Sequence, residues 1–164
     1  MLTIRLSRKQ DGTVILHCRR ADGTETWQRQ DARRAGFFAF HDLRHYAVET
    51  VLGFRRGFFG LVAEGWEIEE TDGKHARGPL PPEAAIVEQI VGLLDRERVG
   101  GGAPLTAAWV NEHLRAVTAE AGMAAPRSLT DAELDAVRAR AEELHERWAR
   151  VEAGGELKLE WAVG

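Results

Sequence analysis

The two ends of the chain carry the pattern that most restricts its fold. Apolar and polar residues alternate with a period of two over 2–7, and they alternate again at Leu157, Leu159, Trp161 and Val163. This period is typical of a β-strand with one buried face. A single strand is not stable by itself. We therefore expect the C-terminal strand to return to the N-terminal strands and to complete one sheet with them.

Two further strands are expected next to the first one. The apolar run 14–18 indicates a buried strand, and the segment 25–29 indicates a more exposed strand. Turn-forming residues precede each of them, at Asp11-Gly12 and at 21–23. This order predicts an antiparallel meander at the start of the chain.

The region between the third strand and the last strand is expected to be helical. Apolar residues recur there at three- and four-residue steps, the period of an α-helix with a buried face. The expected helices cover 39–53, 57–68, 82–100, a segment that Thr106 caps, and a last segment that starts with a capping box of Thr130 and Glu133. The segment 70–82 is expected to be an exposed loop. The sequence therefore predicts a single α+β domain over 1–164, in which about five helices pack on one face of an antiparallel sheet of about four strands.

Length and charge exclude several classes of protein. A chain of 164 residues suits one domain, and a formal net charge of −4 argues against a nucleic-acid partner. No apolar run approaches the roughly 20 residues that cross a membrane, and the first residues alternate instead of forming a signal peptide. Cys18 is the single cysteine, so an intrachain disulfide is impossible. We therefore expect a cytoplasmic protein.

A candidate metal site lies in the segment FHDLRHYAVETVLGF. His41, His45 and Glu49 follow one another at four-residue steps, which places them on one stripe of a helix. The rest of this helix is apolar, so we expect it to be largely buried. A buried carboxylate needs a partner or a cation. Histidine nitrogen and carboxylate oxygen suit zinc, iron or manganese, so the stripe predicts a divalent metal held by His41, His45 and Glu49.

The third ligand has alternatives, because three ligands on one helix are spread along its axis. Glu64, in a glycine-rich segment, and His145, on the last expected helix, are the other candidates. Glu49 or Glu64 would instead be the catalytic base of a hydrolase-type enzyme, acting on a small-molecule substrate.

A second hypothesis gives the stripe a structural role. One histidine would cap the helix, the other would bond a main-chain carbonyl, and the glutamate would pair with an arginine. The protein would then be a non-enzymatic interaction module. Phe58, Phe59 and Trp66 would form its surface for a protein partner or for a second copy in a homodimer.

The segment HDLRHYAVETVLGFRRGFFGLVAEGWEI, within 37–69, resembles the distinctive part of a family of small bacterial proteins that has no assigned function. The resemblance supplies no activity. The order His41-Asp42-x-x-His45 is also similar to the zinc motif of an accessory family of ubiquinone biosynthesis. That family continues with a glutamate twelve positions after the second histidine, where this chain has Gly57. It is also all-helical, which does not fit the expected meander, so its function is not carried over.

Overall fold

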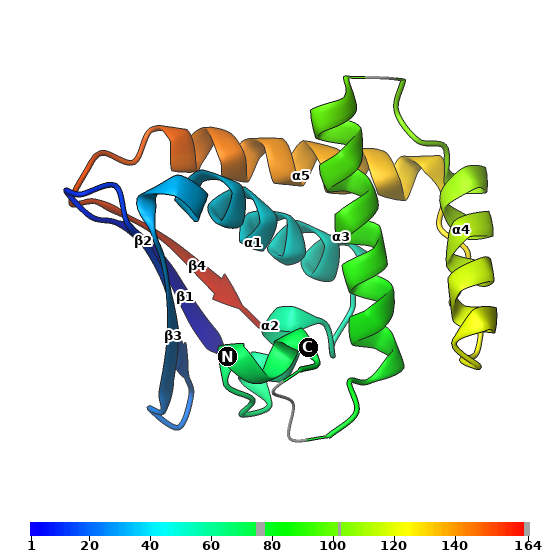
Figure 1. The fold of residues 1–164 in the computed structure, drawn as a ribbon, viewed down its shortest axis with the longest axis horizontal. Helices are drawn as coiled ribbons and strands as arrows, with labels where there is room; N and C mark the ends of the chain where they lie inside the picture. The colour runs from blue at the N-terminus through cyan, green and yellow to red at the C-terminus, as the bar shows by residue number, and fades with distance from the viewer. Residues whose placement is uncertain (75–77, 102, 163–164) are drawn as a thin grey trace.

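A four-stranded antiparallel sheet forms one side of the molecule (Figure 1). The computed structural model describes residues 1–74, 78–101 and 103–162. The strands lie in the order β3-β2-β1-β4, with the bounds β1 (Leu2–Arg8), β2 (Val14–Arg20), β3 (Glu25–Gln30) and β4 (Glu156–Trp161). Leu2 pairs with Trp161, so the last strand closes the sheet beside the first one, as expected. Val163 lies outside the described residues.

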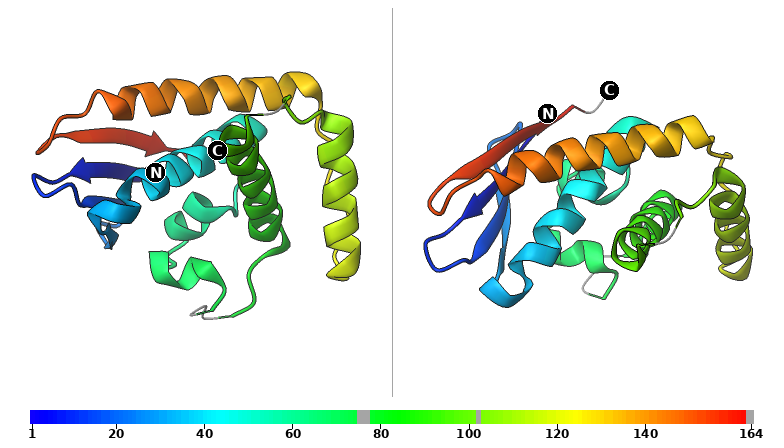
Figure 2. Two further views of the ribbon diagram at one scale, coloured as in Figure 1. Left: turned by 45° about the horizontal axis from the view of Figure 1, so that its top comes forward. Right: turned by 90° about the horizontal axis from the view of Figure 1, so that it is seen from above.

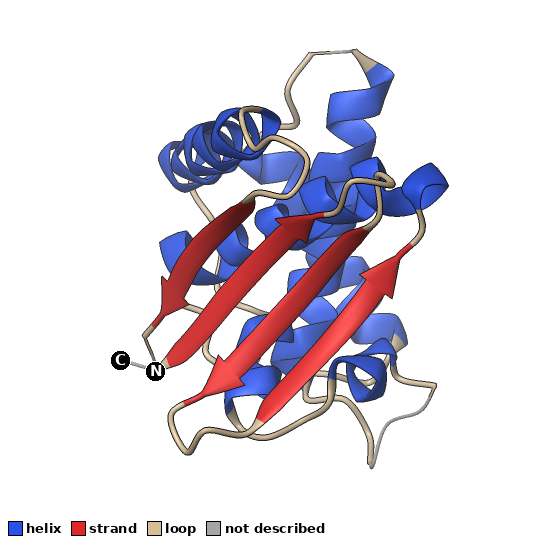
Figure 3. Ribbon diagram, turned by 90° about the vertical axis from the view of Figure 1, so that its left-hand side faces the viewer, coloured by secondary structure: helices blue, strands red, loops and turns tan. Residues whose placement is uncertain are grey.

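The helices cover one face of this sheet, which confirms the predicted α+β class. Figure 3 looks onto the open face, with the helices behind it. Their bounds are α1 (Ala32–Leu52), α2 (Phe58–Ala63), the 3-10 helix η1 (Ile68–Asp72), α3 (Pro82–Gly100), α4 (Ala107–Glu120) and α5 (Asp131–Ala149). Thr106 caps α4, and Thr130 and Glu133 form the expected capping box of α5.

Helix α1 is the central helix of the domain. It contacts β2 and β3 on its sheet side, and it also packs against α2, α3 and α5. Figure 2 shows α5 running beside α1, while α4 lies at the end of the molecule away from the sheet. Because neighbours surround α1, its polar residues between Asp42 and Glu49 are buried with its apolar ones.

Helix α1 begins seven residues before the predicted start at 39. The carboxylate of Asp31 accepts hydrogen bonds from the backbone N–H groups of Arg33 and Arg34, and so caps the first turn. The first turn of α1 is polar, so it lacks the periodic apolar residues from which the start of a helix is predicted. The end at Gly53 is as predicted, with this glycine in the left-handed region at a φ of 73°.

The single helix predicted over 57–68 is two short helices, α2 and η1. Gly65 separates them with a φ of 100°, a conformation that a helix interior does not contain. The predicted loop therefore starts after Asp72, and residues 75–77 lie outside the described residues.

The core extends from the covered face of the sheet across α1 to α3, α4 and α5. Leu2, Ile4 and Leu6 on β1 are completely buried, as is Cys18 on β2, which pairs with Ile4. Burial raises the pKa of the Cys18 thiol to about 12, so this thiol is an inert core residue. None of the described helices combines the length and the apolar character that crossing a membrane requires.

Candidate metal centre

Three ligating side chains converge between α1 and α3. His41 and His45 come from α1, Glu88 comes from α3, and one ligating atom of each lies within 4.8 Å of the others. Nε2 of His45 is 3.2 Å from Nε2 of His41 and 3.3 Å from Oε1 of Glu88. The side chain of His45 is only 2% exposed, whereas that of Glu88 is 46% exposed, so the group opens to solvent on the α3 side. This group could hold a metal ion.

Carboxylates orient both imidazole rings. Nδ1 of His41 is 2.7 Å from Oδ2 of Asp95, which also contacts the guanidinium of Arg44. Nδ1 of His45 faces Oε1 of Glu49 at 3.7 Å, which is too long for a hydrogen bond, so Glu49 acts on this ring mainly through its charge. In His41, a proton held on Nδ1 by Asp95 leaves the lone pair on Nε2. The Nε2 atoms of His41 and His45 face each other.

The observed separations fit a metal site. Two nitrogen ligands about 2.0–2.1 Å from a tetrahedral zinc ion lie about 3.3 Å apart. The Nε2 atoms of His41 and His45 are separated by 3.2 Å, and the His45–Glu88 separation is 3.3 Å. The carboxylates behind the rings match the outer-shell partners that ligating histidines usually have.

Burial and neighbouring charge together set the protonation of the group. Burial by itself lowers the pKa of His45, but Glu49 and Glu88 outweigh it and raise that pKa to about 9. Burial, and then the charge on His45, lowers the pKa of His41. Burial raises the pKa of Asp42 to about 7. Without a metal, a proton on His45 is thus the cation that the carboxylates stabilise.

Glu49 lies beside His45 but is held by a different part of the chain. Its two carboxylate oxygens accept hydrogen bonds of 3.1 Å from the backbone N–H groups of Phe59 and Gly60, in the first turn of α2. A Cβ atom on Gly57 would lie 2.5 Å from the Glu49 side chain, so only glycine allows this close approach. The structure thus brings two of the three predicted ligands together and places the third behind one of them.

The other sequence candidates lie outside the group. The Glu64 side chain is 41% exposed and pairs with Arg56 at 2.9 Å. The Nε2 atom of His145 is 3.2 Å from the carbonyl oxygen of Phe40, and the ring lines a different pocket together with Arg44.

Sequence reasoning missed Glu88 and Asp95. They are seven residues apart on α3, which places them two turns apart on one face of that helix, opposite the histidines of α1. The seven-residue spacing of these two acidic residues was the available signal, although α3 also carries other charged residues, among them Glu83 and Glu97. Only the packing of α3 against α1 shows which acidic residues meet which histidines.

A pocket of about 380 Å³ adjoins the group. Its lining comes from several elements and comprises Gln28, Phe38, His41, Asp42, His45, Phe58, Ile68, Thr71, Asp72, Leu80 and Glu88. A pocket of this volume accommodates a small molecule. The pocket and the three ligating side chains therefore form one candidate site.

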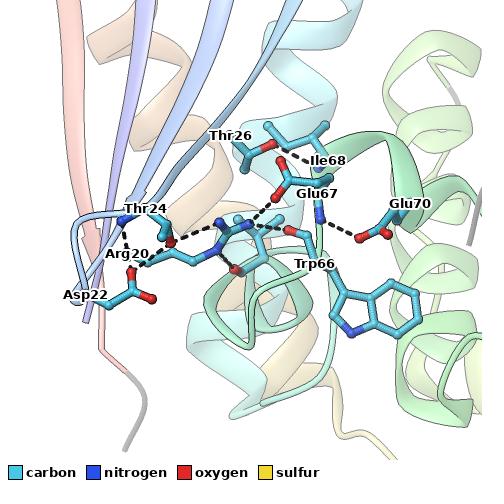
Figure 4. A network of polar contacts seen from close by, with 9 residues as sticks. Arg20, Asp22, Thr24, Thr26, Trp66, Glu67, Ile68 and Glu70 are labelled. Carbon is cyan, nitrogen blue, oxygen red and sulfur yellow. Dashed lines mark hydrogen bonds and ion pairs between the residues drawn. The ribbon is translucent and has the colours of Figure 1, made fainter. Parts of the chain in front are cut away.

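The buried guanidinium of Arg20 fixes the wall that η1 contributes to this pocket (Figure 4). It donates hydrogen bonds to the carbonyl oxygens of Val62 and Trp66, at 2.7 and 2.5 Å. The backbone N–H of Ile68 donates to the hydroxyl of Thr26 at 3.2 Å. These bonds tie the chain between α2 and η1 to the sheet, so the wall is part of the folded core.

The aromatic surface expected for an interaction module is largely buried. Phe59 is 1% exposed and Trp66 is 8% exposed. These two side chains therefore pack inside the chain and do not offer a surface to a partner.

Comparisons with known proteins leave the site to be interpreted from its geometry. No family model, no curated protein and no solved structure matches this chain.

Proposed function

We propose that this protein binds a divalent metal ion through His41, His45 and Glu88 and that the ion serves hydrolysis of a small molecule. Zinc, iron and manganese suit this combination of two imidazoles and one carboxylate.

One observation carries the proposal: two Nε2 atoms face each other at 3.2 Å beside a carboxylate oxygen. Asp95 and Glu49 stand behind the two rings. Three electron-rich atoms at one point repel one another unless a cation lies between them. A proton on His45 can bridge only one pair of these atoms at a time, whereas a metal ion can bind all three.

The number of protein ligands supports a hydrolytic role. Structural zinc sites have four protein ligands, whereas catalytic sites have three and leave one position open. An ion held by His41, His45 and Glu88 would supply Lewis-acid activation of water at neutral pH. The exposed side of Glu88 and the adjoining pocket give water and a small substrate access to this position.

The proposal is tested by titrating zinc, manganese and ferrous iron into protein that was purified without a nickel column and dialysed against chelator. We expect one ion per chain for at least one metal. His45→Ala should weaken its binding by more than about a hundredfold, since removing even an outer-shell partner costs about 10- to 100-fold. His17→Ala is the matched control, because this ring lies on β2, pairs with Glu25 at 3.2 Å and is not part of the group.

Hydrolysis is tested with the metal-loaded protein and p-nitrophenyl acetate. We expect turnover that chelator abolishes, that added metal restores and that Glu88→Gln lacks. An absence of stoichiometric metal, together with identical melting of the wild type and His45→Ala with and without zinc, would remove the proposal.

A further inference from the structure

Asp42 is a buried carboxylate in the pocket for which the described residues provide no hydrogen bond and no ion pair. It is only 7% exposed and it lines the pocket beside the metal group. Its neighbours on α1 are committed elsewhere: the side chain of Arg44 contacts Asp95, and Nδ1 of His41 is also directed to Asp95. The Asp42 oxygens are not sealed from solvent as Nδ1 of His45 and Nδ1 of His145 are, so water or a ligand in the pocket would supply their donors.

Much of the pocket lining is apolar or acidic: it includes Phe38, Phe58 and Leu80, and the carboxylates of Asp72 and Glu88 besides that of Asp42. Its neutral donors are on Gln28 and Thr71, and the Thr71 hydroxyl donates to the carbonyl oxygen of Ile68. His41 and His45 act on Asp42 through their charge. Lysine and arginine are absent from the described residues that line it. A ligand that presents a hydrogen-bond donor to Asp42 would satisfy this carboxylate, whereas an anionic group placed there would be repelled.

We propose that Asp42 accepts a hydrogen bond from an N–H group of the substrate, and that the substrate is a small neutral amide whose carbonyl group faces the metal. This inference rests on the proposed function, because the metal fixes the position of the carbonyl. An amide carries the acceptor for the metal and the donor for Asp42 on two atoms bonded to the same carbon, whereas an ester lacks the donor. Asp42 would therefore set the preference for amides over esters.

The test uses two hydroxamates that chelate zinc through their oxygens and differ only at nitrogen. Butanohydroxamic acid has an N–H, and its N-methyl derivative has none. Calorimetry with the zinc-loaded wild type should show that the N–H compound binds several-fold more tightly, up to about tenfold, which is the usual effect of one hydrogen bond. In Asp42→Ala this ratio should fall to near one, and Asp42→Asn, which keeps an acceptor oxygen, should restore part of it.

Zinc titration of the same three proteins separates this inference from the proposed function. We expect Asp42→Ala to fold and still to bind one zinc ion, with a much smaller loss of affinity than His45→Ala, because Asp42 acts on His41 and His45 only through its charge. If zinc binds normally but the two hydroxamates show the same ratio in the wild type and Asp42→Ala, the role of Asp42 is wrong and the metal site stands. If Asp42→Ala loses zinc as His45→Ala does, Asp42 belongs to the metal and the substrate assignment fails. If the wild type binds no zinc, both proposals fall.

Discussion

Asp95 connects a buried arginine to the metal group through a single side chain. One of its carboxylate oxygens contacts Arg44, and the other lies 2.7 Å from Nδ1 of His41. The first contact holds the carboxylate in place, and the second sets the tautomer of the imidazole. Metal affinity should therefore depend on a residue that is not a ligand.

We predict that Asp95→Asn lowers zinc affinity by about 10- to 100-fold while one ion is still bound at saturation. The amide can no longer hold a proton on Nδ1 of His41 by charge. Competition with a chromogenic chelator measures the change. Asp135→Asn is the control, since Asp135 is exposed and pairs with Arg138 at 2.9 Å. Equal zinc affinity in Asp95→Asn and the wild type would argue against this orienting role.

His145 makes stability depend on pH independently of the metal group. Burial, and then the charge of Arg44, lowers the pKa of His145 from 6.5 to about 4. In this range the unfolded chain binds a proton that the folded chain does not. The contribution is therefore fully present above pH 6.5 and is lost as the pH falls toward 4.

We predict that proton binding by His145 in the unfolded chain lowers the free energy of unfolding by about 2 kcal/mol as the pH falls from 7.5 to 5. His145→Gln should lower the stability at pH 7.5 but should reduce the loss at pH 5. Urea unfolding of both proteins at the two pH values measures the difference. An equal loss of stability in both proteins would show that folding does not lower the pKa of His145.

The candidate site was only partly predictable at the residue level. His41 and His45 can be identified from their four-residue spacing within an apolar segment, which is a local property of the sequence. Glu49 shares that step, yet its carboxylate binds backbone amides of α2. Glu88 is far away in the chain, and its approach to His45 depends on how α3 packs against α1.

At the scale of elements, the corner between α1 and α2 positions the group. In the last turn of α1, the side chain of Glu49 reaches the first turn of α2. This corner needs a very close approach of two backbone segments. A Cβ atom on Gly60 would lie 1.9 Å from the carbonyl oxygen of Arg55. Opening the corner would break the hydrogen bonds that hold the Glu49 carboxylate in place beside His45.

We predict that Gly60→Ala destabilises the protein by about 2 kcal/mol or more, since the backbone must shift to admit the methyl group. Gly92→Ala on α3 is the matched control, because a Cβ atom there would have no neighbour within 4 Å. In a helix that change should stabilise by about 0.5–1 kcal/mol. Urea midpoints measure both, and equal midpoints for the two variants would contradict the tight corner.

The elements themselves were predicted well where their period is strong. The strands and the helices α3 and α5 repeat their apolar residues regularly and were found. The start of α1 was missed because Asp31 caps a turn without an apolar face. The division of 57–68 was missed because Gly65 breaks the helix although apolar residues continue through Trp66 to Ile68.

At the scale of the whole molecule, the reactivity of the Cys18 thiol reports how often the sheet opens. It is completely buried on β2 between the partners Ile4 and Thr26, and burial raises its pKa to about 12. A thiol reagent can reach it only when β2 separates from the core.

We predict that the Cys18 thiol reacts more than about a hundredfold more slowly in the native protein than in urea, in proportion to the open population. Arg19→Cys adds a matched thiol at the next position, which faces the open side of the sheet. That thiol should react at once in the native state. Rapid reaction of two thiols per chain in this variant would show that the sheet opens easily.

The three candidate ligands also have a mechanical consequence. Two of them lie on α1 and the third on α3, with the whole segment from Gly53 to Pro81 between these helices. A bound ion would be a reversible cross-link that closes this loop and lowers the entropy that the chain gains when it opens. The local concentration of the ion would then set the rigidity of the substrate pocket as well as its chemistry.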